Sequence, residues 1–138
     1  MLTFLLLINI INPDQAQCMA EAIYFEARGE HEAGQVAVGN VIMNRVRSSS
    51  FPNSVCEVVH RGTGKVHQCH FSYYCDSISE EIKDAAAFTV ASYIAINVML
   101  GKATILHDAT HYHADTVSPY WAKDYKIVRK IGKHIFYR

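Results

Sequence analysis

The order of apolar and polar positions along the chain predicts helices first and strands last. Residues 13–28 carry apolar positions at helical spacing, and Asn12 can cap their first turn. Pro13 suits the first helical position, Gln15 stands at the capping-box position, and Gly29 suits the position just after a helix end. We therefore expect the first helix over these residues.

Two more helices, a helical turn and a hairpin are expected after it. The segment 31–47 is apolar nearly all round, which predicts a buried helix, and the Ala- and Ile-rich body of residues 80–100 is expected in the core as well. Ser77 or Ser79 would begin this third helix, and Gly101 would end it. The remaining expected elements are a helical turn at 54–60, an irregular functional loop at 61–78 and a β-hairpin at 125–138.

Length and composition indicate one domain over residues 1–138. Half of the 138 residues are hydrophobic, which is enough for one core, and a formal net charge of zero argues against a nucleic-acid partner. The apolar N-terminal segment, residues 1–12, is shorter than the about 20 residues of a spanning helix, so no stable membrane span is expected. No Lys or Arg precedes it, and we favour core packing over a degenerate export signal. We expect a monomer.

Glu26 is a candidate general acid. It shares one apolar stripe of the first helix with Met19 and Ile23. Loss of hydration and the helix C-terminus both raise the pKa of a carboxyl group there, and a protonated carboxyl group can donate to a glycosidic oxygen. The alternative is a structural Glu26 paired with Arg28 or Arg45. Spacing marks no second carboxylate; those that could approach Glu26 are Glu30, Glu32, Asp76 and Asp115.

The stretch THYHAD places His111, His113 and Asp115 at alternate positions, so that on a strand they would share one face. A zinc site with the distant His107 or His134 is conceivable. The pattern lacks the H-E-x-x-H spacing of many zinc enzymes, and we favour histidines that bond protein or sugar groups. We therefore expect no metal and no cofactor.

The four cysteines allow three disulfide pairings. Cys69 and Cys75 flank only five residues and could close a local loop, which would leave Cys18 to meet Cys56. Four reduced, mostly buried thiols are the other interpretation. The residues alone leave this open.

Six sequence blocks together resemble one family. CMAEAIYFEARGE, GQVAVGNVIMNRV, FPNSVCEVV, CHFSYYCD, HYHADTVSPYW and IGKHIFYR, which span residues 18–138, are similar to the SleB/CwlJ family of bacterial cell-wall hydrolases. The resemblance implies an α+β fold, mainly helical, with a lysozyme-like catalytic lobe and a small C-terminal β-hairpin portion. It implies a peptidoglycan glycosidase that cleaves between N-acetylmuramic acid and N-acetylglucosamine. The catalytic residue it implies is Glu26, in the E-A-R-G-E block.

The resemblance also implies how and where the protein acts. A lytic transglycosylase can use a single Glu as acid and base to form 1,6-anhydro-N-acetylmuramic acid, so no second carboxylate is needed. The alternatives are a hydrolytic muramidase, a zinc-dependent amidase, and a non-catalytic wall-binding or virion protein. Action at the cell wall, in the periplasm or outside the cell, favours disulfides, Cys69–Cys75 first, and a phage endolysin is one expected setting. The substrate-binding residues that match family blocks are Tyr24, Asn44, Phe71, Ser72, Tyr73, His113 and Trp121.

Overall fold

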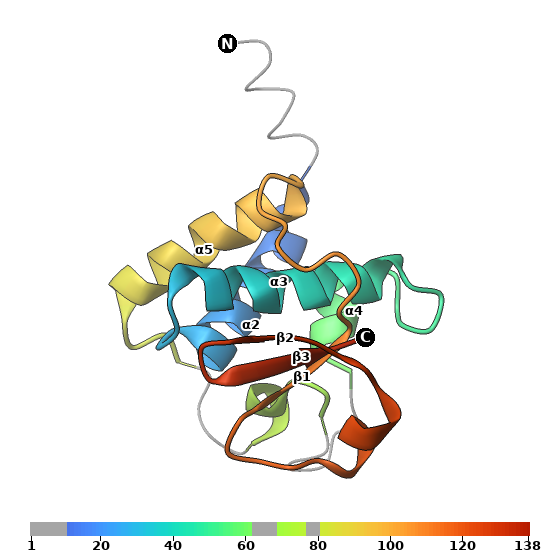
Figure 1. Cartoon of the computed structure of the whole chain (residues 1–138). Helices are drawn as coiled ribbons and strands as arrows, with labels where there is room; N and C mark the ends of the chain where they lie inside the picture. Colours follow the sequence, from blue (N-terminus) through green and yellow to red (C-terminus); the bar gives the residue numbers. More distant parts are fainter. Residues whose placement is uncertain (1–10, 62–68, 77–80) are drawn as a thin grey trace.

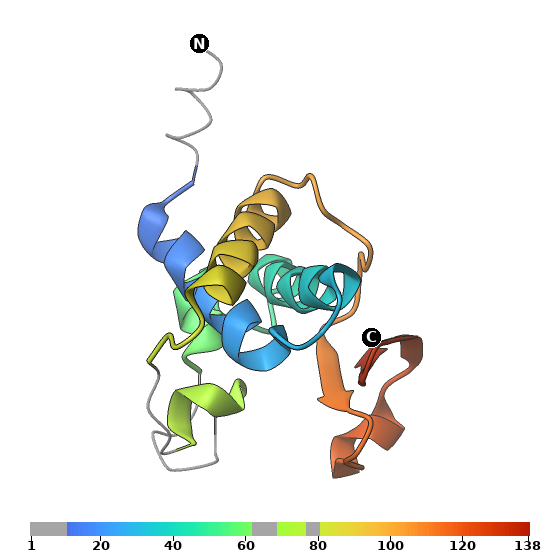
Figure 2. The ribbon, with the colours of Figure 1, turned by 90° about the vertical axis from the view of Figure 1, so that its left-hand side faces the viewer.

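The computed structural model describes residues 11–61, 69–76 and 81–138 of the chain (Figure 1). Four helices of this described part pack together as one lobe, and a three-stranded sheet lies beside them with the last part of the chain (Figures 1 and 2). The expected mainly helical α+β fold is confirmed. The segment 1–10, most of the apolar N-terminal stretch, lies outside the described residues.

The first described helix, α2 (Pro13–Ala27), has the expected bounds to within one residue. The Asn12 side chain accepts hydrogen bonds from the Asp14 and Gln15 backbone amides, as its place before Pro13 predicts. Gln15 does not close a capping box, which corrects the expectation. Its Oε1 instead accepts a hydrogen bond from the Cys56 amide at 2.9 Å and so ties α2 to a neighbouring helix.

Helix α3 (Glu32–Arg47) crosses the middle of the helical lobe and is buried along most of its length, as its apolar surface predicts (Figure 1). The short helix α4 (Val55–Val59) is capped by Ser54, whose Oγ accepts from the Glu57 amide. A disulfide joins Cys18 of α2 to Cys56 of α4, and a second joins Cys69 to Cys75 across the 3₁₀ turn η1 (Ser72–Cys75). Both bonds follow the pairing that the local Cys69–Cys75 loop suggested.

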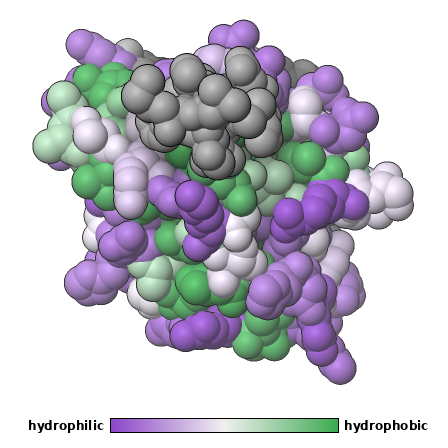
Figure 3. All heavy atoms as spheres, turned by 90° about the horizontal axis from the view of Figure 1, so that it is seen from above, coloured by the Kyte–Doolittle hydropathy of each residue, from purple (hydrophilic) through white to green (hydrophobic). Residues whose placement is uncertain are grey.

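Helix α5 (Ala85–Met99) differs from the expectation in two ways. It begins five residues later than predicted, because Asp84 caps it by accepting from the Ala87 amide, and the earlier candidates Ser77 and Ser79 lie outside the described residues. Its apolar body is also not all core. One stripe is buried, and the other faces solvent with Val90, Tyr93 and Ile96 exposed, so polar and apolar side chains mix on the face seen from above (Figure 3).

The sheet contains the expected hairpin and one more strand. β2 (Ile127–Ile131) and β3 (His134–Tyr137) pair antiparallel around the turn at Gly132, and β1 (His111–Ala114) pairs with the other edge of β3, which gives the order β1-β3-β2. A 3₁₀ turn, η2 (Tyr120–Asp124), lies between β1 and β2. Gly132 has φ 56°, a left-handed conformation that suits glycine.

Two buried asparagines of α3 position β1. Asn40 accepts from the Ile105 and Leu106 amides and donates to the Ala103 carbonyl, and Asn44 donates to the Leu106 and Ala109 carbonyls. These side chains replace the backbone partners that an irregular buried loop would otherwise lack. They hold the segment that leads into β1 against the helical lobe. None of the helices in the described part is both long and apolar enough to cross a membrane.

Candidate active site

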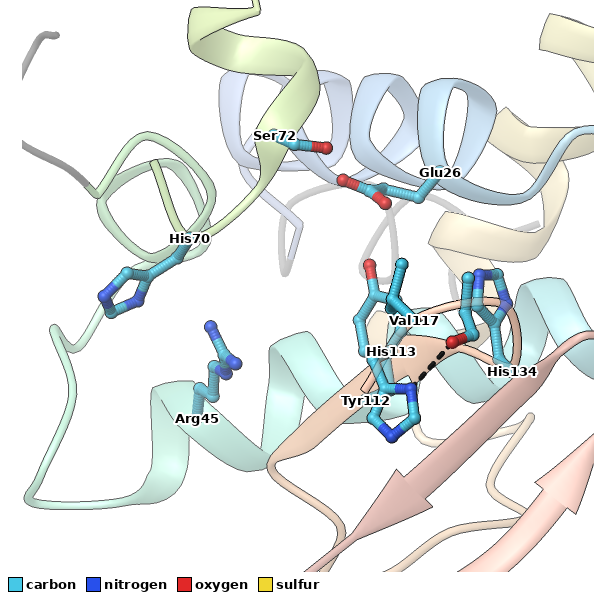
Figure 4. Close-up of a pocket in the computed structure, with 9 residues that line it drawn as sticks. Glu26, Arg45, His70, Ser72, Tyr112, His113, Val117 and His134 are labelled. Atoms are coloured by element: carbon cyan, nitrogen blue, oxygen red, sulfur yellow. Dashed lines mark hydrogen bonds between the residues drawn. The ribbon is translucent and has the colours of Figure 1, made fainter. Parts of the chain in front are cut away.

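A cavity of about 260 Å³ lies between the helical lobe and the sheet. Figure 4 shows the Glu26 carboxyl group near Ser72 and the Tyr112 hydroxyl, with Arg45 and His70 together at the other end. The walls therefore come from segments that are far apart in sequence. The full lining is Glu26, Arg45, His70, Ser72, Tyr112, His113, Ala114, Val117 and His134.

Glu26 reaches this cavity from the last turn of α2, one turn after Ile23, which is completely buried. Burial raises the pKa of Glu26 from 4.5 to about 7, and the charge of Asp76 acts in the same direction. Hydrogen bonds from the Tyr112 side chain and the Ser72 backbone, together with the charge of Arg45, oppose the rise. The result is a carboxyl group that can both donate and accept a proton near neutral pH.

Tyr112, like His70, is a polar group of the cavity that sequence analysis missed. It lies on β1, where its hydroxyl meets Glu26, while its ring packs between Phe71 and Phe136 at centroid distances of 6.4 and 5.5 Å. Burial raises the pKa of Tyr112 well above its usual value, so the phenol keeps its proton and donates it in the bond to Glu26. The sequence offered one signal: Tyr112 stands between His111 and His113, so on a strand its side chain points to the face opposite to theirs.

The structural alternative for Glu26, an ion pair with Arg28 or Arg45, is not formed within 4.0 Å by these described residues. The Arg28 side chain instead donates to the Tyr24 hydroxyl and lies over that ring. Arg45 lines the cavity, but its Nε donates to the Thr110 carbonyl oxygen at 2.7 Å. Glu26 is the carboxylate among the described residues that line the cavity.

Glu30, considered as a second carboxylate, holds the hairpin turn instead. Its Oε1 accepts from the Lys133 amide at 3.2 Å and lies 3.6 Å from His134 Nδ1. The approach is close: a Cβ added at Gly132 would clash with Glu30 Oε2. The contact joins the α2–α3 connection to the sheet. Asp76 is the other candidate whose charge reaches Glu26.

Two of the expected substrate-binding residues, Ser72 and His113, line the cavity. The hydroxyl of Tyr24 accepts from the Asp84 amide in the core. Asn44 holds the loop before β1. The other three pack around the site: Phe71 and Tyr73 are buried, and Trp121 contacts the rings of His111, His113 and Tyr137.

The histidines of THYHAD bond protein oxygens. His113 Nε2 lies 2.6 Å from the Tyr137 hydroxyl, and its Nδ1 lies 2.7 Å from the Ala114 carbonyl oxygen. Burial, with the charges of Arg45 and His70, lowers the pKa of His111 to about 4. Within residues 11–61, 69–76 and 81–138, no group of three or more His, Cys, Asp and Glu side chains is placed to hold a metal ion.

Comparison with known proteins gives relatives over nearly the whole chain. Residues 29–137 match the sequence model of a family described as Cell Wall Hydrolase. A spore cortex-lytic enzyme of Bacillus cereus is 35% identical over 128 residues, which are 93% of this chain and 46% of that protein. One of Bacillus subtilis is 34% identical over 119 residues, 86% of this chain and 35% of that protein. The chain spans less than half the length of these curated relatives.

Two solved structures share the fold. The crystal structure of the catalytic domain of the Bacillus cereus SleB protein matches with a TM-score of 0.70 and 31% identity, over 92% of this chain and 91% of that one. The catalytic domain of the germination-specific lytic transglycosylase SleB from Bacillus anthracis matches with a TM-score of 0.70 and 30% identity, over 93% and 97%. The similarity covers both the helical lobe and the sheet.

Proposed function

This chain belongs to the Cell Wall Hydrolase family, and we propose that it is a lytic transglycosylase that cleaves peptidoglycan between N-acetylmuramic acid and N-acetylglucosamine, with Glu26 as acid and base. The observation that carries the proposal is the state of Glu26. It is the carboxylate among the described cavity residues, and its pKa of about 7 suits a group that gives and then takes a proton.

In the first step, protonated Glu26 donates to the glycosidic oxygen. The bond from muramic C1 to that oxygen breaks, the N-acetylglucosamine 4-hydroxyl leaves, and C1 gains oxocarbenium character. Ionised Glu26 receives hydrogen bonds from Tyr112 and the Ser72 amide, which stabilise it after the transfer. It then accepts the proton of the muramic 6-hydroxyl as O6 bonds to C1. The product is a 1,6-anhydro sugar, and no water is consumed.

A hydrolytic muramidase is the second candidate, and Asp76 favours it. A hydrolase of the common kind uses a second carboxylate to activate water or to form a glycosyl intermediate. The charge of Asp76 reaches Glu26, although Asp76 is not among the residues that line the cavity. The two reactions differ by one water molecule in the product.

We propose that the protein acts at the cell wall, outside the cytoplasm. The two disulfides support this location, because such bonds persist in oxidising compartments. A phage endolysin or a bacterial wall-lytic enzyme would both fit it. The relatives named spore cortex-lytic enzymes make bacterial spore wall a further substrate to include in the test.

The test is mass spectrometry of soluble fragments released from purified sacculi and from spore cortex by the native protein and by Glu26→Gln. We expect anhydro-muropeptides from the native protein and none from the variant. Reducing muropeptides, heavier by one water, would establish the muramidase and direct mutagenesis to Asp76. Free peptides with intact glycan, lost on addition of a chelator, would establish an amidase. Binding to sacculi without any release would overturn an enzymatic role.

A further inference from the structure

The Arg45 side chain is buried at one end of the cavity with part of its hydrogen-bonding capacity unused. The residue is 7% exposed. Its Nε donates to the Thr110 carbonyl, and its guanidinium carbon lies 4.8 Å from the ring centre of Phe51 and 5.4 Å from that of Phe71. These contacts hold the guanidinium plane in place. Its Nη1 is buried and has no hydrogen-bond partner among the described residues.

Such an unpaired buried donor is rare in folded proteins and is destabilising. The cost disappears when a ligand supplies the acceptor. Arg45 lines the cavity, so its guanidinium group borders the space that a ligand would occupy (Figure 4). The unpaired Nη1 therefore points to an acceptor on the substrate.

The charge around Arg45 specifies the kind of acceptor. His70 lies with it at the same end of the cavity, and burial, followed by the charges of Arg45 and Arg61, lowers the pKa of His70 (Figure 4). Glu26, at the other end, is only partly ionised near neutral pH because its pKa is about 7. No described carboxylate forms an ion pair with Arg45 within 4.0 Å. This end of the cavity keeps a net positive charge, which favours an anion.

We propose that Arg45, with His70 beside it, forms a subsite for a carboxylate group carried by the muramic acid side of the glycan strand. The inference rests on the proposed function, since it names the part of that substrate which the basic end recognises. A guanidinium group presents a planar fork of N–H donors that matches a carboxylate. Two sources offer one: the peptide attached to the lactyl group, or the lactyl group itself where the peptide has been removed.

Occupation of this subsite would also affect catalysis. The charge of Arg45 lowers the pKa of Glu26. A bound carboxylate would neutralise that charge and leave Glu26 protonated to higher pH, in the form that donates to the glycosidic oxygen. Substrates that carry the carboxylate would then be cleaved over a wider range of alkaline pH than substrates without it.

The test combines two variants with four soluble glycan substrates. The substrates are peptide-bearing strands, the same strands with carboxylates converted to amides, peptide-free strands with a free lactyl carboxylate, and their amide form. Arg45→Met removes the charge and keeps an apolar stem, while Arg129→Met, an exposed arginine of β2, is the matched control. Binding is measured by calorimetry in the Glu26→Gln background, and kcat/KM in the active protein.

We expect amide conversion to lower the affinity and kcat/KM of the native protein and of Arg129→Met by roughly 10- to 100-fold, the range of a hydrogen bond to a charged group. On the acidic strands, Arg45→Met should show affinity and kcat/KM lower than those of the native protein by the same factor. On the amide strands, Arg45→Met and the native protein should give equal values. Arg45→Lys should recover part of the loss, because it restores the charge without the fork. A loss confined to peptide-bearing strands assigns the peptide carboxylate, and one confined to peptide-free strands assigns the lactyl carboxylate.

Equal binding of acidic and amide strands by the native protein would overturn the inference while leaving the proposed function intact. That comparison needs no variant, so it holds even if Arg45→Met does not fold. Equal losses in Arg45→Met on both kinds of strand would likewise mean that Arg45 has a structural role. Failure to bind any glycan strand would instead overturn the proposed function.

Discussion

Replacing Tyr112 by Phe removes one hydroxyl group from the site and tests the account of Glu26. The hydroxyl donates a hydrogen bond to the carboxylate, so it stabilises the ionised form and lowers the pKa of Glu26. Its ring also packs against Phe71 and Phe136, and phenylalanine keeps those contacts. The change should therefore alter proton affinity with little change in packing.

The magnitude follows from the strength of the bond. A hydrogen bond to a charged group contributes about 1.5–3 kcal/mol, and about 1.4 kcal/mol corresponds to one pH unit. We expect the pKa of Glu26 to rise above its value of about 7. The alkaline limb of the kcat/KM profile, where the acid loses its proton, should move up by about one to two pH units.

Two assays measure this change. One is the pH dependence of anhydro-sugar release, and the other is a ¹³C NMR titration of glutamate-labelled protein, with the Glu26 signal identified by its absence in Glu26→Gln. Tyr93→Phe is the matched control, because Tyr93 is exposed on α5 and its loss should shift neither curve. An unchanged or lowered titration midpoint in Tyr112→Phe would refute the hydrogen bond as a determinant of Glu26 acidity.

Three further predictions concern stability. Folding raises the pKa of Glu26 from 4.5 to about 7, so the contribution of this group to folding stability is fully favourable below pH 4.5 and is lost as pH rises through 7. At pH 8, the free energy of unfolding of Glu26→Gln, measured in urea, should exceed that of the native protein by up to about 3 kcal/mol. Glu81→Gln, an exposed control, should match the native protein. Gly132→Ala should destabilise more than Gly101→Ala in thermal melts: both glycines have positive φ, which costs about 1–2 kcal/mol with a side chain, but only Gly132 would also displace a carboxylate. Replacing both cysteines of the α2–α4 disulfide, 38 residues apart, by serine should lower the free energy of unfolding by about 4 kcal/mol, and an unchanged urea midpoint would contradict this.

Local sequence signals determined the secondary structure well. The cap at Asn12 and the hairpin pattern of residues 125–138 predicted α2 and the hairpin nearly as observed. These elements depend on backbone hydrogen bonds and conformations within a few residues, which neighbouring side chains specify. The start of α5 was predicted five residues early, because Asp84 rather than a serine caps it.

The place of Glu26 among apolar residues was also predictable from the sequence alone. Glu26 follows Ile23 on a helix stripe whose apolar residues must pack against another part of the protein. A carboxyl group on that stripe loses hydration whichever segment packs there. The resemblance to cell-wall hydrolases gave this residue its role. The sequence of α2 does not show which groups from other segments raise or lower the pKa of Glu26.

Only the tertiary structure decided which residues surround Glu26. Tyr112 reaches the cavity because the asparagines of α3 hold the loop before β1 and because β1 pairs with β3, whereas Arg45 reaches it from α3 itself. Asn44 and Tyr24 had suitable chemistry for a sugar but bond backbone groups in the core. Helical and strand periodicity give the face of each element, whereas the distance between faces depends on contacts between segments far apart in sequence. The sequence therefore determined that Glu26 lies on an apolar helix stripe, and the packing of helices against the sheet determined which groups surround it.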